Sequence, residues 1–360
     1  MRNIAMNGFN KNEIQRIGIL RALYLGDMLC IIPAVRALRK AFPHARITLV
    51  GLPWERNFVK RFSIYFDDFI EFPGWPGLPE QEVIPDKLLE FIAAMQYEHF
   101  DLFLQMQGNG TETNAMSILF GARYTAGLRE PGEQVFNPVY FPESGDDEHE
   151  ILRFLKLTDA LEIPRQGTAL EFPILPEEQR NFEMIQQSLN LLSHNYICIH
   201  PGARNVLRRW PAANFAAIAN NLIAREYTIV LTGSEDERDL LREVASQIQQ
   251  PVINIVDTCG QIGIGELAQI ITHSTLLVSN DTGVSHVAAA LQVPSVIIFS
   301  TYSDPNRWSP LNTNLHKVIP PELANDVAFV WKHVEQQLLY KATSFMPGVA
   351  PDNLPGVSHQ

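Results

Sequence analysis

The sequence has few cysteines, few basic residues and no long apolar run, and each shortage excludes a class of protein. Its three cysteines, Cys30, Cys198 and Cys259, are far apart and lack the short paired spacings of zinc sites and thiol-exchange enzymes. Its 28 Lys and Arg are outnumbered by 40 Asp and Glu, and the formal net charge of -12 argues against general binding of nucleic acid. No segment approaches the roughly 18 apolar residues of a membrane span, and residues 1–16 lack the apolar core of a secretory signal. We therefore expect a cytoplasmic protein with at most peripheral membrane association.

The chain does have enough length, and an alternating pattern, for two α/β domains. Its 360 residues exceed a single ordinary α/β domain, and short β-branched runs alternate with amphipathic helical segments, which is typical of helix-covered parallel sheets. Strands are expected at residues 16–22, 46–51, 101–107, 124–128, 196–200, 228–232, 252–256, 276–279 and 295–300. We expect an N-terminal Rossmann-like domain over residues 1–180, a second over 181–325, and a C-terminal helix and flexible tail over 326–360, with the boundary between residues 171 and 193.

Residues 276–291 read as an apolar strand, a small polar turn and an alanine-rich helix. The first backbone N–H groups of such a helix, together with the positive end of its dipole, can bind a diphosphate. Gly283 lets a ligand approach the backbone closely, Thr282 adds a hydroxyl, and Asp281 could cap the helix or accept from a ribose hydroxyl. His286 lies one turn further along, on the same face. The alternative is that Asp281 is only an N-cap and His286 an ordinary satisfied helix residue.

Residues 199–211 form a second loop after a buried strand, and this loop is basic within an acidic chain. It contains Arg204, Arg208 and Arg209 within six residues. Guanidinium groups match phosphate oxygens bidentately and stay charged at any relevant pH. The loop therefore predicts a phosphate contact, and the alternative is a solvated basic loop at the start of the next helix.

The first strand-to-helix turn of the chain, residues 23–29, places an acid at the head of a helix. Gly26 permits a tight turn, and an ionised Asp27 could remove a proton from an attacking hydroxyl. The alternative is that Asp27 is an ordinary N-cap. Pro33 predicts either a kink in this helix or a start a few residues later.

Weaker signals concern the ribose, the acceptor and a metal. Glu235 opens a helix after a strand and could reach a ribose, or could merely complement the helix dipole. Gln107 and Asn109 lie in a polar run that could bind an acceptor or form a flexible turn. No Asp-x-Asp pair is present to hold a divalent ion against a diphosphate, and residues 146–149 resemble a metal cluster only superficially. We expect no metal and no cofactor.

Further short motifs accompany these segments. In chain order the set is Gly26-Asp27 with Pro33-Ala-Val-Arg-Ala-Leu38, Phe42-Pro-His-Ala-Arg-Ile47, His200-Pro-Gly-Ala203, Arg209-Trp-Pro211, Ser279-Asn-Asp-Thr-Gly283 with His286, and Asp304-Pro-Asn-Arg-Trp308. The set covers roughly residues 15 to 310 and resembles glycosyltransferase family 9, the heptosyltransferase family. No single motif would suffice, but this order is hard to obtain by accident.

The resemblance implies a GT-B fold, in which two Rossmann-like domains with parallel sheets face each other across a cleft. It also implies an inverting, metal-independent transfer of a heptose or related sugar to a hydroxyl of a glycan or lipid-linked acceptor, as in lipopolysaccharide biosynthesis. The donor would be a nucleotide-diphosphate sugar, with an ADP-sugar favoured.

By the same resemblance, Asp27 looks like the family's catalytic base. The donor-binding residues implied are Arg208, Glu235, Asp281, Thr282, Gly283 and His286. Arginine stands at 208 where the family usually has a lysine that contacts the donor phosphates, and the loop at 107–114 differs from its counterpart in enzymes that build the lipopolysaccharide inner core.

Other functions stay open at this point. One is a nucleotide-sugar epimerase on the same two-domain fold, and another is a catalytically inactive module that only binds a nucleotide sugar. An oxidoreductase is disfavoured, because the first strand-to-helix turn lacks the Gly-x-Gly-x-x-Gly spacing of dinucleotide binding.

Overall fold

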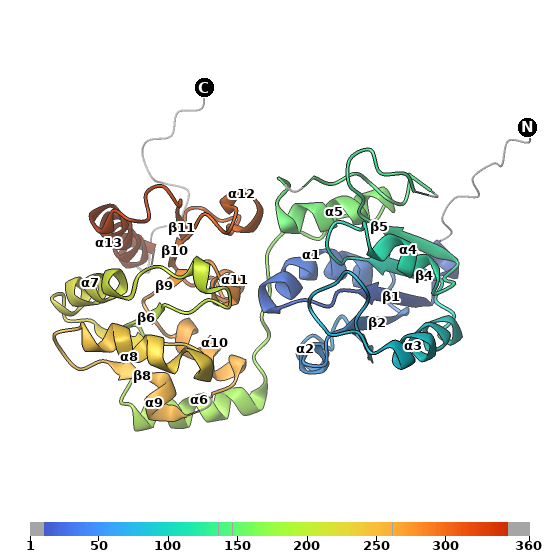
Figure 1. The fold of residues 1–360 in the computed structure, drawn as a ribbon. Coiled ribbons are helices and arrows are strands. Elements are labelled where there is room, and N and C mark those ends of the chain that lie inside the picture. The colour runs from blue at the N-terminus through green and yellow to red at the C-terminus, as the bar shows by residue number, and fades with distance from the viewer. Residues whose placement is uncertain (1–10, 136, 146, 261, 345–360) are drawn as a thin grey trace, which may run out of the picture. The chain divides into compact units, whose positions relative to one another are not determined.

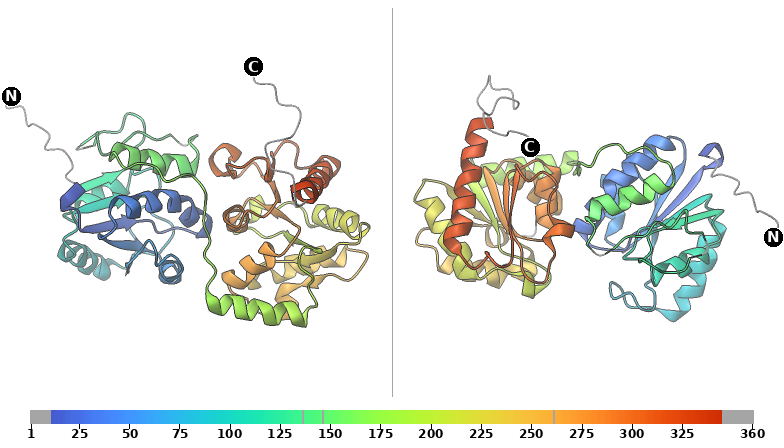
Figure 2. Two further views of the ribbon diagram at one scale, coloured as in Figure 1. Left: turned by 180° about the vertical axis from the view of Figure 1, so that it is seen from behind. Right: turned by 90° about the horizontal axis from the view of Figure 1, so that it is seen from above.

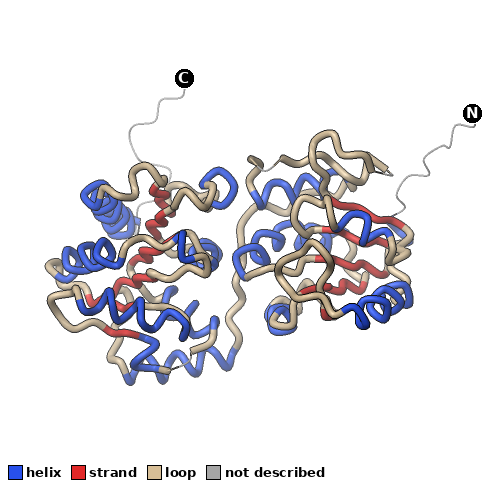
Figure 3. The backbone as a smooth tube through the Cα atoms, viewed as in Figure 1, coloured by secondary structure: helices blue, strands red, loops and turns tan. Residues whose placement is uncertain are grey.

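The computed structural model describes residues 11–135, 137–145, 147–260 and 262–344. The chain divides into two compact units, the N-terminal unit up to Pro173 and the C-terminal unit from Ile174 (Figure 1). Each unit contains one parallel sheet with helices on both of its faces (Figures 2 and 3). Residues 1–10 and residues 345–360, which belong to the expected tail, lie outside the described residues.

The N-terminal unit has a five-stranded sheet of order β3-β2-β1-β4-β5, in which all pairs are parallel. Its strands are β1 (Arg16–Leu20), β2 (Arg46–Gly51), β3 (Asp68–Glu71), β4 (Leu102–Gln105) and β5 (Tyr124–Gly127). Its helices are α1 (Leu25–Ala41), α2 (Glu55–Arg61), α3 (Pro85–Tyr97), α4 (Thr113–Ile118) and α5 (Glu150–Ala160), after a short 3-10 turn at Lys11–Glu13.

The C-terminal unit has a six-stranded parallel sheet of order β11-β10-β9-β6-β7-β8. Its strands are β6 (Tyr196–His200), β7 (Thr228–Leu231), β8 (Ile253–Asn254), β9 (Leu276–Asn280), β10 (Ser295–Ile298) and β11 (His316–Ile319). Its helices are α6 (Pro176–Ser188), α7 (Ala212–Ile223), α8 (Arg238–Ser246), α9 (Ile255–Cys259), α10 (Ile264–Thr272), α11 (Gly283–Ala290), α12 (Pro305–Trp308) and α13 (Val327–Ser344), with 3-10 turns at Val206–Arg208 and Glu235–Glu237.

Strand β6 shows why this sheet is buried on both faces. Its side chains alternate between the two faces, as in any strand. Tyr196 and Cys198 belong to the apolar core that includes residues of α6, α10 and α11. Ile197 and Ile199 belong to the core on the other face, which includes residues of α7, α8 and α13. A strand with two buried faces reads as a continuous apolar run, which is the pattern that predicts it.

Both sheets reverse their strand order at one point. In the N-terminal unit, the chain runs outward from β1 through β2 and β3 and then returns to β4 on the other side of β1. In the C-terminal unit, β6 and β9 flank the corresponding point. Connections that leave two such neighbouring strands diverge and open a crevice at the carboxyl ends, which is where ligands of open α/β sheets bind.

The expected strand at 252–256 is wrong in part. The structure has only Ile253–Asn254 as a strand, and α9 follows at once. The reason is the Asn254 side chain, whose oxygen accepts from the backbone N–H groups of Val256 and Asp257 and so caps a helix there. The other expected strands are present, with ends that shift by up to two residues.

The structure also contains two strands that the pattern does not predict, β3 and β11. Both lie at an edge of their sheet and are only four residues long, so neither shows a full apolar run. Helix α1 begins at Leu25 and continues through Pro33, so of the two alternatives for Pro33 the later helix start is wrong. None of the described helices combines the length and the apolar character that crossing a bilayer requires.

Candidate active site

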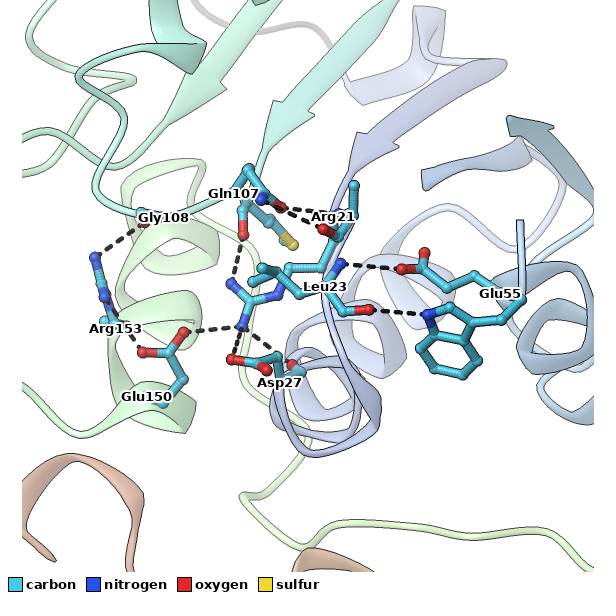
Figure 4. Close-up of polar contacts among 11 residues, drawn as sticks. Arg21, Leu23, Asp27, Glu55, Gln107, Gly108, Glu150 and Arg153 are labelled. Carbon is cyan, nitrogen blue, oxygen red and sulfur yellow. Dashed lines mark hydrogen bonds and ion pairs between the residues drawn. The ribbon is translucent and has the colours of Figure 1, made fainter. Parts of the chain in front are cut away.

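Asp27 lies in the first turn of α1, just beyond the carboxyl end of β1 (Figure 4). The N-cap position of this helix is Tyr24, so the alternative that Asp27 is the N-cap is wrong. The Asp27 side chain is 25% exposed and therefore reaches solvent. The positive end of the helix dipole favours a negative charge at this position.

Arg21 is a fully buried cation beside Asp27. Its Nη2 lies 3.6 Å from Asp27 Oδ1 and donates to the Asp27 backbone carbonyl at 3.2 Å. Nη2 also donates to Glu150 Oε1 at 2.9 Å, and Nη1 donates to the carbonyl of Met106 at 2.6 Å. A buried charge requires paired and hydrogen-bonded surroundings. These bonds therefore hold the guanidinium of Arg21 beside Asp27, the acid predicted from the sequence.

Glu150 joins Arg21 to a second buried arginine (Figure 4). Arg153 Nη1 donates to Glu150 Oε2 at 3.2 Å, and Arg153 Nη2 donates to the carbonyl of Gly108 at 3.2 Å. The two arginines and the two carboxylates of Asp27 and Glu150 balance in formal charge. We call these four residues the buried ion cluster. The sequence reasoning missed three of its members, because Arg21 and Glu150 are 129 residues apart.

The acceptor-side candidates Gln107 and Asn109 differ in the structure. Gln107 is 2% exposed, and its Oε1 accepts from the backbone N–H of Ala22 at 2.8 Å. It therefore fixes the turn after β1. Asn109 Nδ2 donates to Glu130 Oε1 at 2.5 Å, and its Oδ1 accepts from the N–H of Thr111 at 3.1 Å.

In the C-terminal unit, a buried asparagine joins the basic loop to the end of β9. Asn280 Nδ2 donates to the carbonyl of Pro201 at 2.7 Å, and Asn280 Oδ1 accepts from the N–H of Trp210 at 2.9 Å. The loop after β6 and the turn before α11 are therefore neighbours at the point of reversed strand order. The sequence reasoning gave Asn280 no role.

Arg208 and Asp281 form an ion pair within this neighbourhood. Arg208 Nη1 lies 3.5 Å from Asp281 Oδ2, and Arg208 Nε donates to the carbonyl of Tyr302 at 3.2 Å. The Asp281 side chain is 4% exposed and also accepts from the Ser303 hydroxyl. Thr282 occupies the N-cap of α11, so the alternative that Asp281 is the N-cap is wrong. Asp281 instead holds Arg208 beside the start of α11.

The remaining residues of the turn lie at and inside α11. Gly283 is the first helical residue, and the first backbone N–H groups of a helix have no carbonyl partner within it. His286 is buried one turn further along, and its ring meets Trp308 of α12 edge-on with centroids 6.2 Å apart.

A second ion pair, with a buried histidine nearby, borders the basic loop. Arg209 Nη2 lies 3.5 Å from Glu237 Oε1, and Glu237 Oε2 accepts from the N–H of Ser234 at 2.9 Å. His200 Nδ1 is 3.0 Å from Thr232 Oγ1. Burial lowers the pKa of His200; Glu237 opposes this shift, and Arg209 adds to it. The histidine at the end of β6 is thereby kept uncharged near neutral pH.

Glu235 is placed differently from Glu237. Its side chain is 45% exposed, and both of its carboxylate oxygens accept from Arg238, at 2.8 and 2.7 Å. These hydrogen bonds lower its pKa. Glu237, two residues further on, is the carboxylate that contacts the basic loop, and the sequence reasoning missed it.

The described part of the chain contains no group of three or more His, Cys, Asp or Glu side chains arranged to hold a metal ion. Asp146, the first residue of the 146–149 segment, lies outside the described residues.

Two parallel Rossmann-like sheets in one chain, each with charged side chains where its strand order reverses, define an α/β protein of the GT-B fold. The sequence profile of glycosyltransferase family 9 (heptosyltransferase) matches residues 88–337, and the chain belongs to this family. It is therefore a glycosyltransferase.

Individual relatives agree with this assignment. Lipopolysaccharide heptosyltransferase 3 of Escherichia coli is 32% identical over 126 residues, which are 34% of this chain and 36% of that relative. Lipopolysaccharide heptosyltransferase 2 of Escherichia coli K12 is 24% identical over 326 residues, which are 84% of this chain and 90% of that relative. The solved structure of the Escherichia coli ADP-heptose lipopolysaccharide heptosyltransferase II is 20% identical, with a TM-score of 0.68 over 91% of this chain and 100% of that one.

The fold alone does not separate transfer from epimerisation. A UDP-GlcNAc 2-epimerase from Methanocaldococcus jannaschii is 15% identical and superimposes with a TM-score of 0.51 over 90% of this chain and 93% of that one. The family match, and not the shared fold, favours glycosyl transfer over the epimerase alternative.

Proposed function

We propose that the protein transfers a heptose from ADP-heptose to a hydroxyl of a lipopolysaccharide-type acceptor, with inversion at the anomeric carbon and without a metal ion. The observation that carries the proposal is the position of Arg208, beside Asp281 and the start of α11, where the strand order of the C-terminal sheet reverses. The names of the relatives support the donor and the acceptor class.

The donor's diphosphate would bind to Arg208 and to the first turn of α11. A guanidinium can donate two parallel hydrogen bonds to phosphate oxygens, and the N–H groups at Thr282 and Gly283 lie at the positive end of a helix dipole. Asp281 would orient Arg208, and His286 would line the same turn. Neutralising the diphosphate makes ADP a better leaving group, and this electrostatic term requires no metal ion.

The nucleoside would lie further along the same edge of the sheet. Glu235 is the proposed contact for the ribose, and in the structure its oxygens accept from Arg238. A hydroxyl pair on the ribose would have to share or replace those bonds. Because Glu235 is about half exposed, the exchange involves little desolvation.

Asp27 would act as the base that takes the proton of the acceptor hydroxyl. The neighbouring Arg21 favours the charged form of the carboxylate, which is the form a base requires. Attack on the anomeric carbon from the side opposite the diphosphate inverts the configuration. On the acceptor side, Asn109 offers polar atoms, whereas Gln107 would act through the turn that it holds.

Two measurements test the proposal. In a thermal-shift panel of ADP, GDP, UDP and dTDP, ADP should raise the melting temperature most, because a ligand of the native state stabilises it by mass action. In a transfer assay with ADP-heptose and lipopolysaccharide of truncated core, product should form only with both substrates, with the opposite anomeric configuration and in the presence of EDTA.

Other results would replace this proposal by an alternative. Release of free sugar or of its epimer from the donor alone would favour the epimerase. ADP binding without product formation on any acceptor would favour the inactive module.

A further inference from the structure

The backbone of Leu23, in the turn between β1 and α1, is held at both of its polar groups by two consecutive residues. Its N–H donates to Glu55 Oε1 at 3.0 Å, and its carbonyl accepts from the indole Nε1–H of Trp54 at 3.1 Å (Figure 4). Trp54 and Glu55 lie at the N-cap and the first residue of α2. Leu23 is four residues before Asp27, so this pair restrains the segment that leads into the first turn of α1.

The side chain of Glu55 has an unusual environment for a carboxyl group. It is fully buried, and its Oε2 has no hydrogen-bond partner among the described residues. A Cβ on Gly51 would overlap this Oε2, so the glycine leaves the space that the carboxyl group occupies. A buried polar atom without a partner lowers stability. An apolar residue would remove that penalty, and it would also remove the bond to Leu23.

The charge of Glu55 bears on Asp27. Burial raises the pKa of Glu55 to about 9; the backbone at Leu52 and Leu23 and the charge of Arg21 lower it, and the charge of Asp27 raises it further. Glu55 is therefore uncharged near pH 7. It holds the turn without placing a second negative charge near Asp27, where such a charge would favour the protonated form of the base.

We propose that Glu55 and Trp54 are positioning residues of the transfer reaction, which clamp Leu23 and thereby place the Asp27 carboxylate for proton removal. This inference rests on the proposed role of Asp27 as the base. The clamp lies on the β2–α2 side of the turn, while Gln107 holds the neighbouring Ala22 from the β4 side. It also lies outside the buried ion cluster, so it can be changed without removing an ion pair.

The test compares three clamp variants with the parent in the full chain, with ADP-heptose and lipopolysaccharide of truncated core as substrates. Glu55→Gln keeps an uncharged side chain with an oxygen that can accept from Leu23, and its kcat should stay within about 3-fold of the parent. Glu55→Ala loses the acceptor, and its kcat should fall about 10- to 100-fold, the scale of a misplaced catalytic group. Trp54→Phe loses the indole donor, and its kcat should fall about 3- to 10-fold. The KM for ADP-heptose should not change in any of these variants.

Glu178→Ala is the matched control, because Glu178 is a buried acid of the C-terminal unit that accepts from the backbone N–H of Leu175 at 2.9 Å. It should lower the melting temperature while kcat is retained.

The clamp is overturned if Glu55→Ala or Trp54→Phe keeps the parent kcat, if Glu55→Gln is as impaired as Glu55→Ala, or if the loss appears in the KM for ADP-heptose. Should Glu55→Ala not fold, Glu55→Gln and Trp54→Phe still decide. Asp27→Asn in the same series separates the two proposals. If Asp27→Asn is active, Asp27 is not the base and both proposals are wrong. If Asp27→Asn is inactive while Glu55→Ala keeps the parent kcat, only the clamp is wrong.

Discussion

Arg208 Nη1 lies 3.5 Å from Asp281 Oδ2, although the two residues belong to loops that are 73 positions apart in the sequence. The aspartate is almost completely buried and also accepts from Ser303, whereas a third of the arginine side chain is exposed. The Asp281 carboxylate therefore holds one side of the Arg208 guanidinium, whose remaining N–H groups can reach a ligand.

Arg208→Ala should weaken ADP binding about 10- to 100-fold, because hydrogen bonds to charged groups contribute about 1.5–3 kcal/mol each. Arg208→Lys should bind with intermediate affinity, since an ammonium supplies the charge without the bidentate geometry. Isothermal titration calorimetry with ADP measures both. Arg225→Ala is the control, because Arg225 is an exposed arginine paired with Glu335 and with none of the proposed donor contacts. An unchanged dissociation constant in Arg208→Ala would exclude this arginine from the phosphate site.

Asp27→Asn should reduce transfer by about two orders of magnitude or more, as expected for the loss of a general base. Its dissociation constant for ADP should match that of the parent, because the proposed donor contacts all belong to the C-terminal unit. Steady-state rates and calorimetry on the same preparation check both statements. Transfer at the parental rate would remove Asp27 from the mechanism.

The stability of the chain should depend on pH through Glu55. In the folded protein the pKa of Glu55 is about 9, against an ordinary value near 4.5, so between these values the native state holds a proton that the unfolded state has released. Stability then falls as pH rises through this window. Glu55→Gln lacks this titration, so the melting temperature of the variant minus that of the parent should grow from pH 5.5 to pH 8.5. A difference that is constant with pH would show that Glu55 is ionised in the native state.

Gly202→Ala should disturb the contact between Glu237 and the basic loop. A Cβ at this position would overlap both carboxylate oxygens of Glu237, which are held by Ser234 and Arg209. We expect a loss of about 1–3 kcal/mol in the free energy of unfolding, the usual scale of overpacking. The double variant Gly202→Ala, Glu237→Ala should be no less stable than Glu237→Ala alone. If the two effects simply add in denaturant unfolding, the steric explanation is wrong.

The sequence was most informative where an apolar run is followed directly by a polar turn. Strand β9 and the turn at Asp281 to Gly283 stand out because an apolar run ends in small polar residues, and the parallel topology then brings such ends to one edge. The same reasoning failed for contacts between distant segments. Nothing near Arg21 in the chain indicates that Glu150 will neutralise it, and no periodicity distinguishes Glu235 from Glu237 within one 3-10 turn.

The division of the chain into two units, each with its own sheet and apolar core, has a consequence for how related enzymes can diverge. On the proposed roles, the base and the polar loop at 107–114 belong to one unit, and the groups that neutralise the departing ADP belong to the other. Changes that remodel the loop for a new acceptor glycan leave the leaving-group chemistry untouched. One donor can thus serve a lineage of enzymes that extend different sugars.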